Sequence, residues 1–188
     1  MCSCPIPFTS FVLYIKPLES LNKLIKTMKA NPSISPLIEQ FNMQTRLFDN
    51  CIEGFSRDFD KRPNESTNHA AWLAGHIVST RINIANMIGV EYKNPYSDLY
   101  SDFKPLDKSA KYPSLKEVKK NWDEISPKFS AKLNELDDKF LSAPAPFKLP
   151  IGDGTMTGVL AFFSHHEAYH LGQLGTTRKY FGFEGMKY

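Results

Sequence analysis

Apolar side chains recur at steps of three and four along four segments of the chain, which is the spacing of an amphipathic helix. These segments predict helices over about residues 35–59, 66–89, 114–140 and 157–182. The longer stretches between them are rich in proline, glycine and aromatic residues and have no sustained periodicity. Outside the short apolar run at residues 8–15, nothing in the sequence is typical of a β-strand.

Residues that favour helix ends mark the boundaries of these segments. The predicted N-caps are Ser35 before Pro36, one of Ser66, Thr67 and Asn68, Ser114 in a capping box with Glu117, and Thr157. Pro127 lies inside the third helix, but the apolar stripe keeps its phase on both sides, so we expect a kink there rather than a break.

The fold class that follows is all-α, with a four-helix bundle as its natural architecture. The first and second helices are joined by a short turn and should be antiparallel. Residues 90–113 are long enough to travel back along the bundle, so we expect a crossover that leaves the second and third helices parallel. The expected order is therefore up-down-down-up.

Composition narrows the class of protein further. Of the 188 residues, 41% are hydrophobic and 23% are charged, which fits one ordinary globular domain. Lys and Arg total 23 against 20 acidic residues, and the excess is not concentrated on one segment. We therefore expect no nucleic-acid partner, because phosphate binding needs a concentrated basic face.

The N-terminal region and the cysteines suggest where the protein resides. Met28 precedes the first strong helix signal, so we expect residues 28–188 to be the domain and residues 1–27 to be an extension that is disordered or not native. The apolar run at residues 8–15 is too short to cross a membrane. The three cysteines do not form a disulfide framework, which favours a reducing, cytoplasmic compartment.

Histidines carry the candidate chemistry. His166 and His170 are four residues apart, so on a helix both can bind one metal ion. They interrupt a line that Val159 and Phe163 begin as apolar, and a metal would satisfy nitrogens that a bundle core otherwise leaves unpaired. His76, within the apolar stripe of the second helix, is the candidate third ligand.

The other two histidines are predicted to have different roles. His69 is two helical turns from His76, too far to bind the same ion, and either lines the mouth of the site or caps the helix. His165 is expected to be a surface or packing residue. Residues 166–170 also match the HExxH motif of zinc proteases, but that interpretation is disfavoured because no later histidine can complete such a site.

Two segments resemble the metal-binding motifs of the DinB/YfiT-like superfamily. They are NHAAWLAGHI at residues 68–77 and FFSHHEAYHLGQL at residues 162–174. The resemblance covers roughly residues 33–182 and implies a four-helix bundle that binds a divalent metal. Carried over position by position, it implies the ligands His76, His166 and His170, and matches Gln173 to the glutamine of the motif.

Three neutral imidazoles leave coordination positions open for water or substrate, which is the pattern of a catalytic metal site. Because characterised relatives act on low-molecular-weight thiols, the resemblance implies a metal-dependent transferase that activates a small thiol for attack on an electrophile. Glu167, Tyr169 and Gln173 are the candidate catalytic residues. For Glu167 the alternatives are a partner for an imidazole N–H or an interhelical ion pair.

Two other classes of function stay open. One is a metal-dependent hydrolase with water as the nucleophile, and the other is a non-enzymatic, stress-associated metal-binding bundle. We expect zinc or nickel as the divalent metal ion, with iron as a further candidate. The expected partners are a small-molecule substrate and a second copy of the chain in a homodimer, with no membrane. The aromatic connection from Tyr92 to Tyr112 is a candidate wall of the site.

Overall fold

The computed structural model describes residues 30–151 and 154–188. Four long helices dominate this part of the chain, and they are α2 (Ser35–Ile52), α3 (Ala70–Met87), α5 (Leu115–Leu133) and α7 (Met156–Tyr180). The connections carry the shorter helices α4 (Ser97–Tyr100), η1 (Ser101–Phe103) and α6 (Asp138–Leu141). The described residues contain no β-strand, which confirms the all-α class. The predicted extension, residues 1–27, lies outside the described residues.

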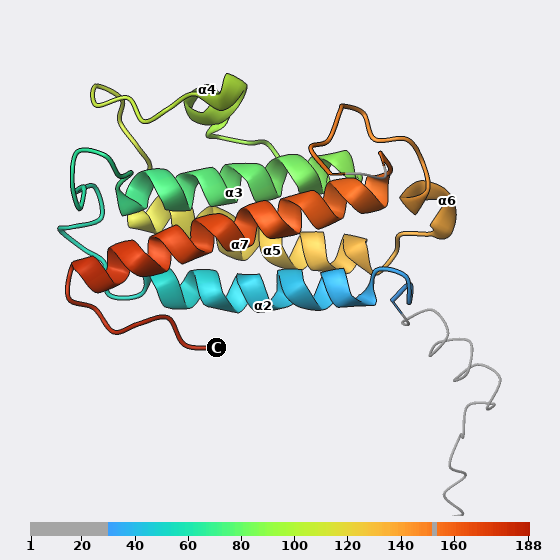
Figure 1. Cartoon of the computed structure of the whole chain (residues 1–188), viewed down its shortest axis with the longest axis horizontal. Coiled ribbons are helices and arrows are strands. Elements are labelled where there is room, and N and C mark those ends of the chain that lie inside the picture. Colours follow the sequence, from blue (N-terminus) through green and yellow to red (C-terminus); the bar gives the residue numbers. More distant parts are fainter. Residues whose placement is uncertain (1–29, 152–153) are drawn as a thin grey trace, which may run out of the picture.

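The four long helices lie side by side (Figure 1). Helices α2 and α3 each pack against both α5 and α7. Because α2 and α3 have little contact with each other, they lie at diagonally opposite positions of the bundle. Colour along the chain shows that α3 and α5 run in one direction and that α2 and α7 run in the other. These are the relative directions expected from the long connection between α3 and α5. Among the described helices, none has both the length and the apolar character needed to cross a membrane.

The observed helix ends differ from the predicted ones at several points. Helix α2 ends at Ile52 and not near Phe59, with Ile34 rather than Ser35 at the N-cap position. Phe55 and Phe59 are buried all the same, because they pack as loop residues at the end of the bundle, where Phe55 contacts Phe183. Phe55 and Phe59 therefore continue the apolar spacing of α2 because they are buried, although they do not belong to the helix.

The later helices show the same kind of difference. Helix α5 ends at Leu133, and the predicted continuation toward Phe140 forms the separate short helix α6. The predicted cap Thr157 lies within α7 and donates to the carbonyl of Leu141 at 3.1 Å, whereas Thr155 caps the helix. The predicted capping box of Ser114 and Glu117 is confirmed.

Large aromatic side chains fill the centre of the bundle. Trp122 and Phe129 from α5 and Phe41 and Phe48 from α2 are almost completely buried. Phe48 and Trp122 lie 4.1 Å apart between ring centroids, and Phe41 meets Phe129 edge to face at 4.9 Å. Burying side chains of this size stabilises the fold by roughly 2–3 kcal/mol each. This core fixes α2 on α5, while polar side chains occupy much of the contact between α3 and α7.

Candidate metal centre

Three histidine side chains converge where α3 packs against α7. His76 comes from α3, and His166 and His170 come from successive turns of α7. The Nε2 atom of His166 lies 3.3 Å from Nε2 of His76 and 3.2 Å from Nε2 of His170. One ligand atom from each residue can be chosen so that all lie within 4.8 Å of one another, an arrangement that could hold a metal ion.

Protons alone do not satisfy this arrangement. His170 places Nδ1 2.8 Å from Oε1 of Gln173, which favours a proton on Nδ1 and leaves a lone pair on Nε2. The single Nε2 of His166 faces two other ring nitrogens and can either donate one proton or accept one. If it carries a proton, that proton can be directed at only one of the two neighbouring nitrogens, and if it does not, its lone pair faces the lone pair of His170, so at least one of the two contacts lacks a well-aligned hydrogen bond. A cation among the three Nε2 atoms would be bound by all three lone pairs, so the donor set fits a divalent metal.

Burial keeps these imidazoles neutral. Burial first, and the neighbouring histidines second, lower the pKa of His76 to about 3 and that of His166 to about 4. Burial also lowers the pKa of His170, while the hydrogen bond to Gln173 acts in the opposite direction. Neutral imidazole is the form that binds metals, so the site is prepared for a cation well below neutral pH.

Aromatic side chains enclose the histidines on the α3 side. The Trp72 ring stacks on His76 at 4.9 Å between centroids and an angle of 15°. Tyr100, from α4, lies 5.4 Å from the His76 ring and 5.7 Å from Trp72. Gly75 allows this approach, because any side chain there would meet the Tyr100 hydroxyl and Pro113. The connection between α3 and α5 thus contributes a wall through Tyr100, while Tyr112 lies against His69 instead.

Polar atoms without partners accumulate around the same rings. Among the described residues, buried side-chain atoms with no hydrogen-bond partner include Nδ1 of His76, Nδ1 of His166, Nε1 of Trp72 and the hydroxyl of Tyr100. Each such group costs about 1–3 kcal/mol when it is left unpaired. Their concentration at one place is typical of a functional site rather than of a core optimised for stability.

Gln173 and Tyr169 lie together on α7, Tyr169 directly before His170 and Gln173 about one turn after Tyr169. Gln173 contacts His170 through its carbonyl oxygen and donates from Nε2 to the Tyr169 hydroxyl at 3.1 Å. Tyr169 is 58% exposed. Both residues line a cavity of about 630 Å³ between α7 and the connection that precedes α3. The side chains around this cavity are uncharged, and they are Pro63, Asn64, Ser66, Thr67, Asn68, Leu73, Tyr169, Gln173, Thr176, Thr177 and Tyr180.

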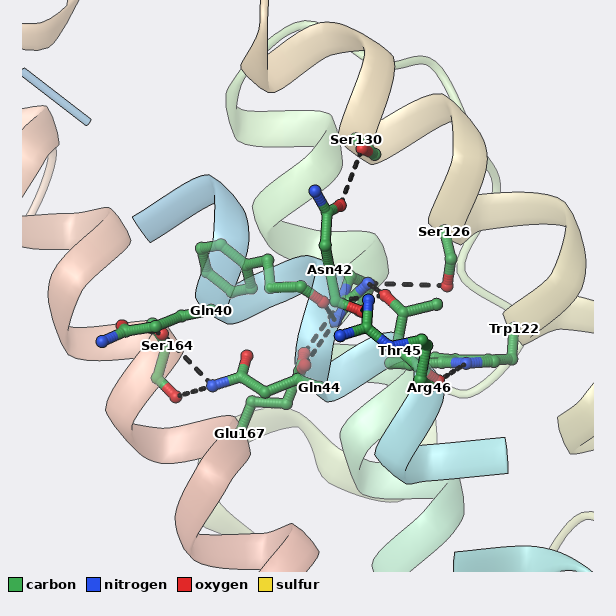
Figure 2. Close-up of polar contacts among 12 residues, drawn as sticks. Gln40, Asn42, Gln44, Thr45, Arg46, Trp122, Ser126, Ser130, Ser164 and Glu167 are labelled. Atoms are coloured by element: carbon green, nitrogen blue, oxygen red, sulfur yellow. Dashed lines mark hydrogen bonds and ion pairs between the residues drawn. The ribbon is translucent and has the colours of Figure 1, made fainter. Parts of the chain in front are cut away.

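Glu167 points from α7 into the bundle core (Figure 2), where it meets Arg81 of α3. Both of its carboxylate oxygens accept from Arg81, Oε2 at 2.9 Å from Nε, and both residues are 1% exposed. An interhelical ion pair was one of the two alternatives for Glu167. Sequence reasoning missed Arg81, although a signal was present, since Arg81 is the only charged residue of α3.

The two remaining histidines lie outside the cluster. His69 is the N-cap of α3, where its Nδ1 accepts from the backbone N–H of Trp72 at 2.9 Å. Capping was one of its two expected roles, and it takes the place of the predicted caps at residues 66–68. His165 is exposed, as expected for a surface residue.

Comparison with known protein families gives a match over most of the chain. A family model described as the DinB superfamily matches residues 40–174, which is most of the chain and includes His76, His166, His170 and Gln173. No curated protein matches the chain.

Proposed function

The chain belongs to the DinB superfamily, and we propose that it binds one divalent metal ion through His76, His166 and His170 and transfers a small thiol to an electrophile. The observation that carries the metal site is the convergence of three Nε2 atoms with contacts of 3.2 and 3.3 Å, which protons cannot fully satisfy. The thiol-dependent reaction rests on the resemblance described above.

A divalent ion on neutral imidazoles supplies a positive centre that acidifies a coordinated thiol. In the transfer, the thiol loses its S–H proton to solvent, a bond forms between sulfur and the electrophilic carbon, and the leaving group departs with the electron pair of the broken bond. The residues of the chain prepare the site for this step. Gln173 holds the proton of His170 at Nδ1 and so directs the lone pair of Nε2 inward.

Tyr169 and Gln173 also face the small-molecule ligand in this proposal. They line the cavity of about 630 Å³, whose size is within the range of small-molecule sites. Because no charged side chain lines the cavity, we expect it to favour an uncharged part of the thiol or the electrophile. The Tyr169 hydroxyl accepts from Gln173 and keeps its own proton available for a ligand oxygen.

Metal content tests the ion site. Tag-free wild-type protein is expected to carry about one zinc or nickel ion per chain by elemental analysis, and His76→Ala, His166→Ala and His170→Ala are each expected to lose more than 90% of it. His165→Ala is the matched control, since it removes an exposed imidazole next to His166 and should keep the metal. Equal metal content in all five proteins would refute the site.

A second experiment tests the reaction. Metal-loaded protein is incubated with a panel of small thiols and an activated aryl or alkyl halide, and the thioether is quantified by mass spectrometry against metal-free protein. Metal-dependent thioether supports the transferase. Metal-dependent hydrolysis of the halide to an alcohol or phenol, without thioether, would indicate the hydrolase. The absence of any metal-dependent product would favour a non-enzymatic bundle.

A further inference from the structure

The buried ion pair between Arg81 and Glu167 lies beside the histidine cluster. Glu167 directly follows His166 in α7, and Arg81 follows His76 in α3 by five residues. On each helix, the histidines of the cluster and the charged residue that face the other helix therefore lie within about one and a half turns of one another. The two partners of the ion pair and the three histidines together form the polar contact between α3 and α7.

The pair also reaches the other two long helices. Nη1 of Arg81 donates to Oγ1 of Thr45 in α2 at 2.9 Å and contacts Oγ of Ser126 in α5 at 3.5 Å. The guanidinium lies 4.2 Å from the Trp122 ring centroid. Figure 2 shows Thr45, Ser126 and Glu167 pointing from three different helices toward one place in the core. Arg81 is thus held by partners on α2, α5 and α7.

A guanidinium and a carboxylate that meet through two parallel hydrogen bonds fix direction as well as distance. Rotation of α7 about its axis would move the Glu167 carboxylate off Arg81 and would turn His166 and His170 away from His76 by the same angle. Apolar side chains at these positions would still fill the core, but they would tolerate such a rotation. Moreover, a buried ion pair adds little to stability compared with well-packed apolar residues, so stability alone does not explain its presence.

We propose that Arg81 and Glu167 are positioning residues for the metal centre: their ion pair sets the rotation of α7 so that the imidazoles of His166 and His170 face His76. The proposal rests on the proposed metal site, and it assigns Glu167 to alignment of the ligands rather than to contact with substrate.

The central test replaces both partners with apolar residues of similar size, Arg81→Met with Glu167→Leu. The double variant is expected to be folded by circular dichroism and to melt within about 5 °C of the wild type, because no unpaired charge is left in the core. Its affinity for Zn²⁺ by calorimetry is expected to fall about 10- to 100-fold. Wild-type affinity in the folded double variant would overturn the proposal.

A second variant guards against failure of the double variant to fold. Arg81→Lys keeps the charge but loses the two-pronged contact, so Zn²⁺ affinity should fall at least fivefold. Phe129→Leu is the matched control, because Phe129 packs against the Arg81 guanidinium at 5.0 Å and its loss weakens the core without breaking the ion pair. It should lower the melting temperature and leave Zn²⁺ affinity unchanged. Equal loss of affinity in both variants would mean that the pair acts only through stability.

A metal-free measurement separates this proposal from the metal site itself. In wild-type protein without metal, nuclear Overhauser contacts are expected between the His76 and His166 rings, whose centroids are 5.1 Å apart. These contacts should weaken or vanish in Arg81→Lys and persist in Phe129→Leu. If the wild type binds no Zn²⁺ but shows this pattern, the proposed function fails and the alignment role stands. Unchanged contacts in Arg81→Lys would overturn the alignment role.

Discussion

At the scale of single residues, the histidine cluster joins burial to chemistry. Removal from water lowers the pKa of His76, His166 and His170. Just below pH 6.5, these imidazoles are therefore less protonated in the folded protein than in the unfolded chain. The same shifts carry a cost for the metal-free fold at acidic pH.

Acid is therefore expected to destabilise the metal-free protein before its carboxylates titrate. The unfolded chain takes up protons at these histidines near pH 6.5, whereas His166 and His76 in the folded state stay neutral down to about 4 and about 3. Because the unfolded state binds more protons in this window, the free energy of unfolding falls as the pH falls below about 6.5. Between pH 6.5 and 5 we expect a loss on the order of 1 kcal/mol for each of His76 and His166, measured by urea unfolding.

His76→Asn with His166→Asn serves as the comparison for this pH effect. The double variant lacks two of the imidazoles with a lowered pKa, so its stability should change less between pH 7 and pH 5. An identical pH dependence in both proteins would show that other groups are responsible.

Two glycines inside helices provide a matched pair of substitutions. A methyl group at Gly75 would overlap the Tyr100 hydroxyl and come within 3.0 Å of Pro113, whereas one at Gly172 would meet nothing within 4 Å. Gly172→Ala should stabilise the fold by about 0.5–1 kcal/mol through helix propensity. Gly75→Ala should destabilise it by about 1 kcal/mol, because the clash exceeds that gain. Chemical denaturation measures both, and equal stabilisation would contradict the close packing of Tyr100.

At the scale of elements, the start of α3 depends on an unusual cap. The imidazole of His69 accepts from the backbone N–H of Trp72 and so requires a neutral ring, and burial lowers its pKa. This contact fixes the first turn of α3, which carries Trp72, and His76 lies about one turn further along.

Substitution at this cap should distinguish His69 from the caps predicted by the sequence. His69→Ala is expected to cost about 1 kcal/mol of stability, and His69→Asn should recover part of that loss because asparagine also caps helices. Ser66→Ala, in the predicted cap region, should stay within about 0.5 kcal/mol of the wild type. Thermal unfolding measures all three, and a larger effect at Ser66 than at His69 would contradict the observed boundary.

At the scale of the whole molecule, the C-terminal tail closes one end of the bundle. Phe183 packs on Phe55 with ring centroids 4.8 Å apart, and Nε of Arg178 donates to the carbonyl of Glu184 at 2.7 Å. The backbone N–H of Lys187 donates to Asn50 at 2.8 Å. The described residues thus form a continuous core from α2 to the tail.

Truncation from the two ends should therefore have opposite results. A chain that begins at Met28 is expected to keep the melting temperature and metal content of the full chain, because the buried side chains of the described helices pack into one cluster with one another. A chain that ends at Gly182 should lose about 1–2 kcal/mol, mainly through exposure of Phe55. Scanning calorimetry and elemental analysis check both, and a lower melting temperature for the chain starting at Met28 would show that the extension contributes to the fold.

The sequence by itself determined the elements and the ligand candidates. Helical spacing is a local property, so the four helices, the capping box at Ser114 and the pairing of His166 with His170 could be read directly. The exact ends could not, because Phe55 and Phe59 keep a helical spacing while they pack as loop residues.

Only the tertiary structure decided which residues from distant segments meet. Arg81 and Glu167 are separated by 86 positions and no local pattern pairs them, yet the packing of α3 on α7 brings them together as a buried ion pair. Tyr100 reaches His76 only because the crossover folds over Gly75. Spacing along a helix can therefore nominate ligands, but their mutual orientation depends on the angle between two helices, which side chains from all four helices set together.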